Sequence, residues 1–168
     1  VSGKGGTGKT SFVAGVGSAL AVLGYEVLCM DCDAGLRNLD LALGLSDRAF
    51  MDYTDVALGR CSLEEAAVAH PRIPRLHPSS LERGRISKEQ MTDLMDQVRQ
   101  RYDYCLLDAP AGLGSMFRLA VCAADRCTVV TTTDVSSLRD AQHTVMLLDP
   151  YFPQGRLHLV VNRVRRKL

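Results

Sequence analysis

The first ten residues have the spacing of a phosphate-binding loop, with two lysines instead of one. The segment Gly3-Lys4-Gly5-Gly6-Thr7-Gly8-Lys9-Thr10 fits the pattern G-x-x-x-x-G-K-[ST]. Glycines without a Cβ let backbone N–H groups turn toward phosphate oxygens, and Lys9 would reach the β and γ phosphates. The Thr10 hydroxyl is a typical Mg²⁺ ligand, and Thr10 and Ser11 begin a helix whose N-terminus favours an anion. The sequence therefore predicts a site for a nucleotide with Mg²⁺.

Two carboxylates could complete this chemistry. Asp108 closes an apolar strand at 104–107, which is the form of a Walker B acid that holds Mg²⁺ through a water molecule. Asp33 follows another apolar run and could orient a water for in-line attack on the γ-phosphate, while Gly35 would let its loop rearrange. Each aspartate could instead serve only as a turn residue. The presence of the phosphate loop favours the metal and catalytic interpretations, with Asp33 as a further candidate metal ligand.

Alternating strands and helices would position these residues. Apolar runs predict strands at 26–31, 73–76, 104–107, 127–132 and 157–161. Helical spacing and capping boxes predict helices from Thr10 to Gly24, at 51–58, at 62–69, from Ser87, at 115–124 and at 137–148. The predicted apolar stripe of the first helix consists of Phe12, Val13, Val16, Ala19, Leu20 and Leu23. Most strands are apolar on both faces, so we expect an α/β fold with a mostly parallel sheet and helices on both faces. Ligands of such sheets bind at the carboxyl ends of the strands, where the polar residues above lie.

Composition limits the alternatives. The chain has 168 residues, 46% of them hydrophobic, and a net charge of +1, which fits one P-loop domain over 1–168 and gives no support for a general nucleic-acid-binding surface. A membrane span and a signal peptide are both absent from the sequence, so we expect a cytoplasmic setting. Val1-Ser2 leaves room only for the end of the strand that normally feeds such a loop. We therefore expect a fragment that lacks most of its first strand.

The cysteines leave one alternative open. Six cysteines occur, at 29, 32, 61, 105, 122 and 127. Cys29 and Cys32 have redox or metal spacing, but they adjoin an apolar run typical of a buried strand. Cys122 and Cys127 also lie in apolar segments, where a free thiol behaves as a small hydrophobic group. Structural thiols are the favoured interpretation, and a metal or cluster role remains as the alternative.

Four segments resemble a known family. They are 4–10 (KGGTGKT), 31–40 (DCDAGLRNLD), 108–112 (DAPAG) and 135–140 (VSSLRD). Together they are similar to the deviant Walker A ATPases of the MinD/ParA group, and 31–40 and 108–112 are similar to its MinD type. The resemblance implies a Mg²⁺-dependent ATPase of the P-loop class. It covers essentially the whole visible chain. The resemblance also implies that the C-terminal part found in family members is not included in this sequence.

The resemblance implies a role for each matching residue. Lys4 would reach across an ATP-sandwiched homodimer to the phosphates of the partner, while Lys9 and Thr10 bind phosphate and Mg²⁺. Asp33 would be the catalytic carboxylate, and Asp108 would hold the metal through water. The implied nucleotide-binding residues are Gly3, Lys4, Gly5, Gly6, Thr7, Gly8, Lys9, Thr10, Ser11, Asn162 and Arg163. The implied interface residues are Lys4, Asn38, Ser136, Ser137 and Asp140.

The resemblance also implies partners. Members of the family form a homodimer on ATP binding, meet the septum inhibitor and topological regulator proteins of the Min system, and associate reversibly with the inner membrane through an amphipathic C-terminal helix. That helix lies outside this sequence. Gly114 and Gln142 stand where the family commonly has acidic residues, which puts regulator recognition in question. Two other functions remain open: a ParA-like ATPase that positions DNA or other cargo, and an iron–sulfur carrier that uses paired cysteines.

Overall fold

The computed structural model describes residues 1–33, 38–45, 52–81, 86–153 and 155–165. Gly35 and the first residue of the helix expected at 51–58 lie outside these ranges. The chain divides into two units, a terminal unit of Val1–Lys9 with Pro110–Leu168 and a central unit of Thr10–Ala109. The expectation of a single domain over 1–168 stays a prediction.

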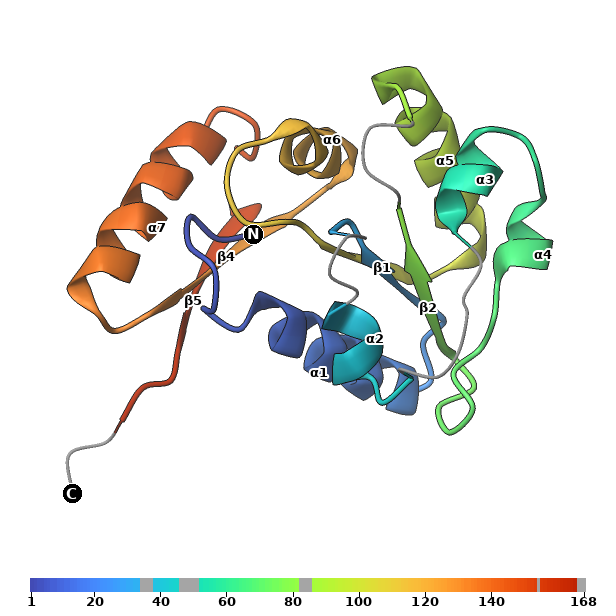
Figure 1. Cartoon of the computed structure of the whole chain (residues 1–168), viewed down its shortest axis with the longest axis horizontal. Helices are drawn as coiled ribbons and strands as arrows, with labels where there is room; N and C mark the ends of the chain where they lie inside the picture. The colour runs from blue at the N-terminus through green and yellow to red at the C-terminus, as the bar shows by residue number, and fades with distance from the viewer. Residues whose placement is uncertain (34–37, 46–51, 82–85, 154, 166–168) are drawn as a thin grey trace. The chain divides into compact units, whose positions relative to one another are not determined.

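The central unit is built on a parallel three-stranded sheet. Strand β1 (Val27–Asp31) lies between β2 (Leu76–Ser80) and β3 (Tyr104–Asp108). Figure 1 shows β1 beside β2. The register places Asp31 opposite both Ser80 and Asp108, so polar residues meet where these strands end. Every residue of β1 and β2 is buried, which fits the apolar β1 run in the sequence. The predicted parallel α/β architecture is confirmed.

Helices cover both faces of this sheet. Figure 1 shows α1 (Lys9–Val22) and α2 (Asn38–Ala42) on one side, and α3 (Tyr53–Ala57) and α5 (Lys88–Arg101) on the other. The short α4 (Leu63–Ala66) and the longer α5 both begin with the predicted capping boxes. The prediction for α4 was too long, because the helix stops at Ala66 instead of continuing to 69.

Helix α1 packs on the sheet through small residues. Its buried positions are Ala14, Gly17 and Ala21, whereas the expected apolar stripe of larger side chains is only partly buried or exposed. A Cβ on Gly17 would collide with the Cys29 sulfur and contact leucine side chains of β2 and β3. The close approach of α1 to the sheet therefore decides which face of the helix is buried, and the size of its apolar side chains does not. The predicted stop at Gly24 is confirmed, since this residue has φ +101° and its N–H bonds to the Ala21 carbonyl at 3.1 Å.

Strand β2 begins three residues later than predicted. Residue Ile73 lies instead in a turn, where its N–H bonds to the His70 carbonyl at 3.3 Å. The strand sequence Leu-His-Pro-Ser-Ser has low strand propensity, and tertiary burial beside β1 overrides it. Pro78 is tolerated because β2 is an edge strand of this three-stranded sheet.

The terminal unit has its own parallel strand pair. Strand β4 (Cys127–Thr132) pairs with β5 (Leu157–Asn162), and Val1 extends the ladder through bonds to Thr128 and Val130, each of 2.9 Å. Helices α6 (Ser115–Ala123) and α7 (Val135–Leu148) share a core with β4. Helix α7 begins at Val135, two residues before the predicted start, because Asp134 caps it. This unit thus holds the phosphate loop beside β4, β5 and α7.

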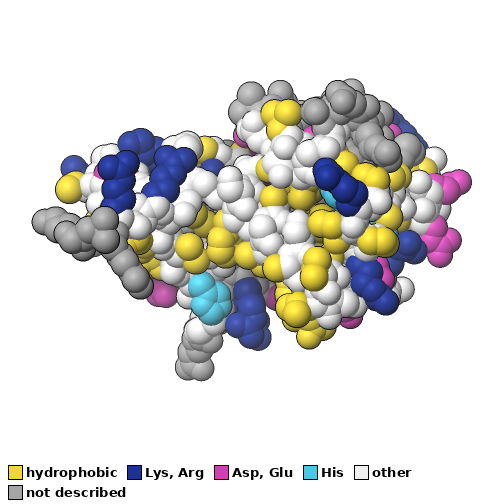
Figure 2. Space-filling view, turned by 90° about the horizontal axis from the view of Figure 1, so that it is seen from below, with side chains coloured by type: hydrophobic (Ala, Val, Ile, Leu, Met, Phe, Trp, Pro, Cys, Tyr) yellow, Lys and Arg dark blue, Asp and Glu magenta, His cyan; other side chains and the backbone are white. Residues whose placement is uncertain are grey.

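The surface carries mixed charges. On the face drawn in Figure 2, lysine and arginine side chains form separate groups with apolar and uncharged atoms between them. Within the described ranges, no helix has the length and apolar character needed to cross a membrane.

Candidate functional site

The phosphate loop has the backbone shape that its glycines predict. Gly6 and Gly8 have φ of +78° and +94°, a region that side chains with a Cβ rarely adopt. Between them, the Thr7 side chain is buried, and its hydroxyl has no hydrogen-bond partner in the described part of the chain. Buried polar groups normally pair, so this hydroxyl and the turned backbone fit an anionic ligand such as a nucleotide phosphate.

Lys9 is held at the base of the loop. Its ammonium group donates to the Ser2 hydroxyl at 2.9 Å, and that hydroxyl donates in turn to the Lys4 carbonyl at 2.6 Å. Ser2 is 1% exposed. The loop lysine is therefore oriented by a residue that the sequence reasoning did not single out.

Lys4 points to the start of α7. Its ammonium group donates to the Ser136 hydroxyl at 3.0 Å and lies 4.0 Å from an Asp134 oxygen. About half of the Lys4 side chain remains exposed, at 51%. The structure thus brings together Lys4 and Ser136, two residues predicted for the interface.

Asp134 organises this end of α7, and sequence reasoning missed it. Its carboxylate accepts bonds from the Ser137 N–H and the Ser136 hydroxyl, at 3.0 and 2.8 Å, and also from the Thr132 hydroxyl. These bonds, with the one from Thr132 largest, hold the pKa of Asp134 well below its usual range. The signal was present in the sequence, because aspartate is a favoured N-cap residue and Asp134 stands directly before the helical pattern of α7.

Gly3 and Asn162 fit the loop against its neighbours. A Cβ on Gly3 would come within 2.9 Å of Asp140, so only glycine allows this approach to α7. The Asn162 amide at the end of β5 donates to the Thr7 carbonyl at 3.0 Å and occupies the space that a Cβ on Gly8 would need. Its oxygen accepts the N–H of Arg163, which has φ +55°. An adenine-binding role for Asn162 and Arg163 stays a prediction.

The central unit contains the carboxylates. Asp108 is buried at the end of β3, and its carbonyl accepts the Cys32 N–H at 3.0 Å. Asp31 is also buried, and its two oxygens accept the N–H groups of Asp33 and Leu39, at 2.8 and 3.2 Å. Asp31 therefore shapes the segment that carries Asp33.

Oxygen donors of the type that Mg²⁺ prefers are present. The Thr10 hydroxyl and the carboxylates of Asp108 and half-buried Asp33 all belong to the central unit and could hold the ion.

The remaining predicted residues vary in exposure. Gly5, Ser11, Asn38 and Ser136 are exposed, Asp140 is half-buried and Ser137 is buried.

The buried thiols behave as core groups. Burial raises the pKa of Cys29 to about 12 and raises that of Cys32 still more clearly, with smaller contributions from Cys105 and nearby aspartates. Such thiols are poor nucleophiles and poor metal ligands. Cys122 is exposed, contrary to the expectation from its apolar segment. Among the described residues, no three or more histidine, cysteine, aspartate or glutamate side chains form a group that could hold a metal ion.

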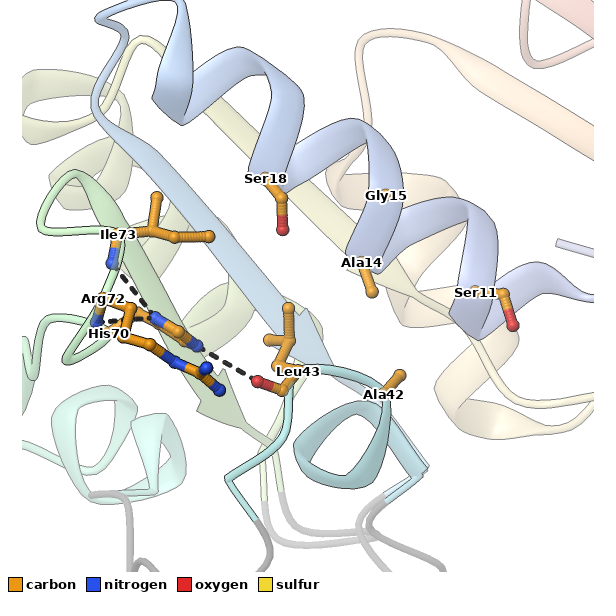
Figure 3. Close-up of a pocket in the computed structure, with 9 residues that line it drawn as sticks. All are labelled: Ser11, Ala14, Gly15, Ser18, Ala42, Leu43, His70, Arg72 and Ile73. Atoms are coloured by element: carbon orange, nitrogen blue, oxygen red, sulfur yellow. Dashed lines mark hydrogen bonds between the residues drawn. The ribbon is translucent and has the colours of Figure 1, made fainter.

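A separate cleft of about 470 Å³ lies in the central unit. Figure 3 shows it between α1, the end of α2 and the turn at 70–73; its lining is Ser11, Ala14, Gly15, Ser18, Ala42, Leu43, His70, Arg72 and Ile73. His70 ties the turn to α2, because its Nδ1 accepts two backbone N–H groups and its Nε2 donates to the Leu43 carbonyl at 3.1 Å. Of the predicted site residues, only Ser11 lines this cleft.

Comparison with known proteins places these features in a family context. A family model described as an AAA domain matches residues 1–149. The septum site-determining protein MinD of Synechocystis is 42% identical over 171 residues, covering 99% of this chain and 64% of its own length. The chain therefore spans about two thirds of that curated relative.

Solved structures of MinD proteins are also similar to this chain. In the MinC:MinD cell division protein complex of Aquifex aeolicus, a chain that is 39% identical matches with a TM-score of 0.87, covering 98% of this chain and 67% of that one. MinD from Pyrococcus horikoshii, complexed with Mg-ADP, is 29% identical with a TM-score of 0.75, covering 95% of this chain and 65% of that one.

Proposed function

This chain belongs to the MinD-type AAA-domain family, and from that membership we propose that the protein is an ATP-dependent dimerisation switch for placing the bacterial division septum. The switch would close when two chains sandwich Mg·ATP and open when ATP is hydrolysed to ADP and phosphate. Because this chain spans 64% of the length of the Synechocystis relative, the activity is proposed for the whole protein.

The observation that carries the proposal is the position of Lys4. This second lysine bonds to Ser136, while the other loop lysine, Lys9, bonds to Ser2 at the base of the loop. Lys4 is half exposed, so its ammonium group is accessible to a second chain. A positive charge delivered to a γ-phosphate only on assembly would make hydrolysis depend on dimerisation.

The other residues would act within one chain. The loop N–H groups and Lys9 would bind the phosphates, and Thr10 and Asp108 would hold Mg²⁺, with Asp33 as a further ligand or as the group that orients the attacking water. Bound Mg²⁺ neutralises charge on the phosphate oxygens. The fit of the loop to phosphate rests on the positive φ of Gly6 and Gly8 and on the buried Thr7 hydroxyl, which has no hydrogen-bond partner among the described residues.

Partners are proposed by relationship. A solved relative is a MinC:MinD complex, which supports a septum inhibitor as one partner of this protein. A topological regulator, and reversible membrane association through residues beyond this chain, follow from the same family membership. The interface would include Lys4, Asn38, Ser136, Ser137 and Asp140.

Sedimentation of the full-length protein tests the proposal. With Mg·ATP the protein should form dimers and pellet with anionic vesicles, and with Mg·ADP it should remain monomeric and in the supernatant. ATP-dependent retention on DNA at low salt, without vesicle binding, would favour the ParA-like alternative. Iron and sulfide in anaerobically purified protein would favour the carrier. A monomer under all nucleotide conditions would contradict the switch.

A further inference from the structure

The Ser2 hydroxyl links the two lysines of the phosphate loop. It donates its one proton to the Lys4 carbonyl at 2.6 Å, so only its lone pairs are left to meet the Lys9 ammonium group at 2.9 Å. The acceptor side of the hydroxyl is thereby aimed at Lys9. A hydrogen bond from a charged donor is stronger and more directional than one between neutral groups.

Ser2 is held in place by burial and by the neighbouring Val1. Its side chain is 1% exposed, and the preceding Val1 is tied to β4 by bonds to Thr128 and Val130. The hydroxyl is therefore anchored to the sheet, whereas the ammonium group of Lys9 is carried on a flexible four-carbon side chain. Since both partners lie in the terminal unit, the contact belongs to one body.

We propose that Ser2 is a positioning residue: it holds the Lys9 ammonium group in place for phosphate binding and fixes the turn at Lys4. This inference rests on the proposed ATPase function for its consequence, and on the two hydrogen bonds of Ser2 for its geometry. A lysine that is already oriented loses less conformational freedom on binding phosphate. Loss of the hydrogen bond between Ser2 and Lys9 should therefore weaken nucleotide binding.

Three variants separate positioning from folding. Ser2→Ala removes the acceptor, Ser2→Thr keeps a hydroxyl, and Ser18→Ala removes a serine hydroxyl that lines the cleft of Figure 3 in the central unit. Thermal unfolding shows whether each variant folds. Lysine side chains labelled with ¹³C, with the Lys9 signal assigned through Lys9→Arg, then report the order of that side chain by NMR relaxation without any nucleotide.

We expect Lys9 to be ordered in the wild type, Ser2→Thr and Ser18→Ala, and to become measurably more mobile in Ser2→Ala. ATP binding should weaken about tenfold in Ser2→Ala alone, as befits loss of a charge-assisted contact. An unchanged Lys9 signal, or a mobile Lys9 with unchanged ATP affinity, would overturn the proposal. If the wild type binds no ATP, the proposed function fails, and the Lys9 signal still decides whether Ser2 holds the lysine.

Discussion

The ammonium group of Lys4 donates a hydrogen bond to the Ser136 hydroxyl across 3.0 Å, joining the phosphate loop to the first turn of α7. Asp134 fixes the far side of this contact, because its carboxylate accepts the same Ser136 hydroxyl at 2.8 Å. An exposed contact of this kind is weak, on the order of 1 kcal/mol or less, so it can be exchanged for a stronger one. The phosphate of a bound nucleotide in a second chain would offer such a partner.

Close packing of α1 gives a matched pair of glycine substitutions. Gly17→Ala should lower the free energy of unfolding by roughly 1–3 kcal/mol, because its Cβ would meet the Cys29 sulfur. Gly15→Ala on the same helix meets nothing within 4 Å and should stabilise by up to about 1 kcal/mol through helix propensity. Urea unfolding measures both. Equal effects of the two substitutions would show that α1 is not pressed against β1.

The capping box of α5 should contribute measurably to stability. Ser87 accepts the Gln90 N–H at 3.2 Å and its own N–H bonds to the Gln90 side chain at 2.8 Å. Ser87→Ala removes one of these bonds and should cost about 1 kcal/mol in urea unfolding. Gln100→Ala, an exposed change near the other end of α5, is the control and should cost little. A Ser87→Ala variant as stable as the control would contradict the cap.

Stability should fall at mildly acidic pH because of His77. This ring is 8% exposed, and its Nδ1 has no hydrogen-bond partner within the described residues. Burial lowers the pKa of His77, the bond to Glu26 partly opposes this, and Arg101 adds a small lowering. The unfolded chain therefore binds more protons, so the free energy of unfolding decreases as pH falls through about 6.5.

The measurement is urea unfolding between about pH 7.5 and 5.5, the range in which an unperturbed histidine titrates. Replacing His77 by glutamine should flatten the decrease. His143→Gln removes an exposed histidine from α7 and should leave the slope unchanged. If both variants keep the wild-type slope, His77 is not the group responsible.

Local signals predicted much of this fold. The capping residues Ser62 and Ser87 gave correct helix starts, and the apolar run ending in Asp108 gave a correct strand. Strand β2 was misplaced because Pro78 and its neighbouring serines carry no strand signal, and only burial beside β1 makes them one. The buried face of α1 was misjudged because the distance between helix and sheet, which no local pattern encodes, selects Gly17.

The candidate site was predictable to a similar degree. Glycine spacing predicted positive φ at Gly5, Gly6 and Gly8, and Gly6 and Gly8 have it whereas Gly5 does not. The partners of the lysines were not predicted, since Ser136 is 132 residues from Lys4 along the chain. Ser2 and Asp134 act through hydrogen bonds that depend on where α7 and β4 lie, which is a tertiary property.

Lys4→Ala in the full-length protein shows whether Lys4 makes ATP-bound chains dimerise. Sedimentation velocity with Mg·ATP should show a dimer for the wild type and for Lys88→Ala, which removes another exposed lysine. Lys4→Ala should keep binding a fluorescent ATP analogue, because Lys9 and the loop remain, yet sediment as a monomer. A Lys4→Ala protein that dimerises with ATP as the wild type does would show that Lys4 is not the residue that couples ATP binding to dimerisation.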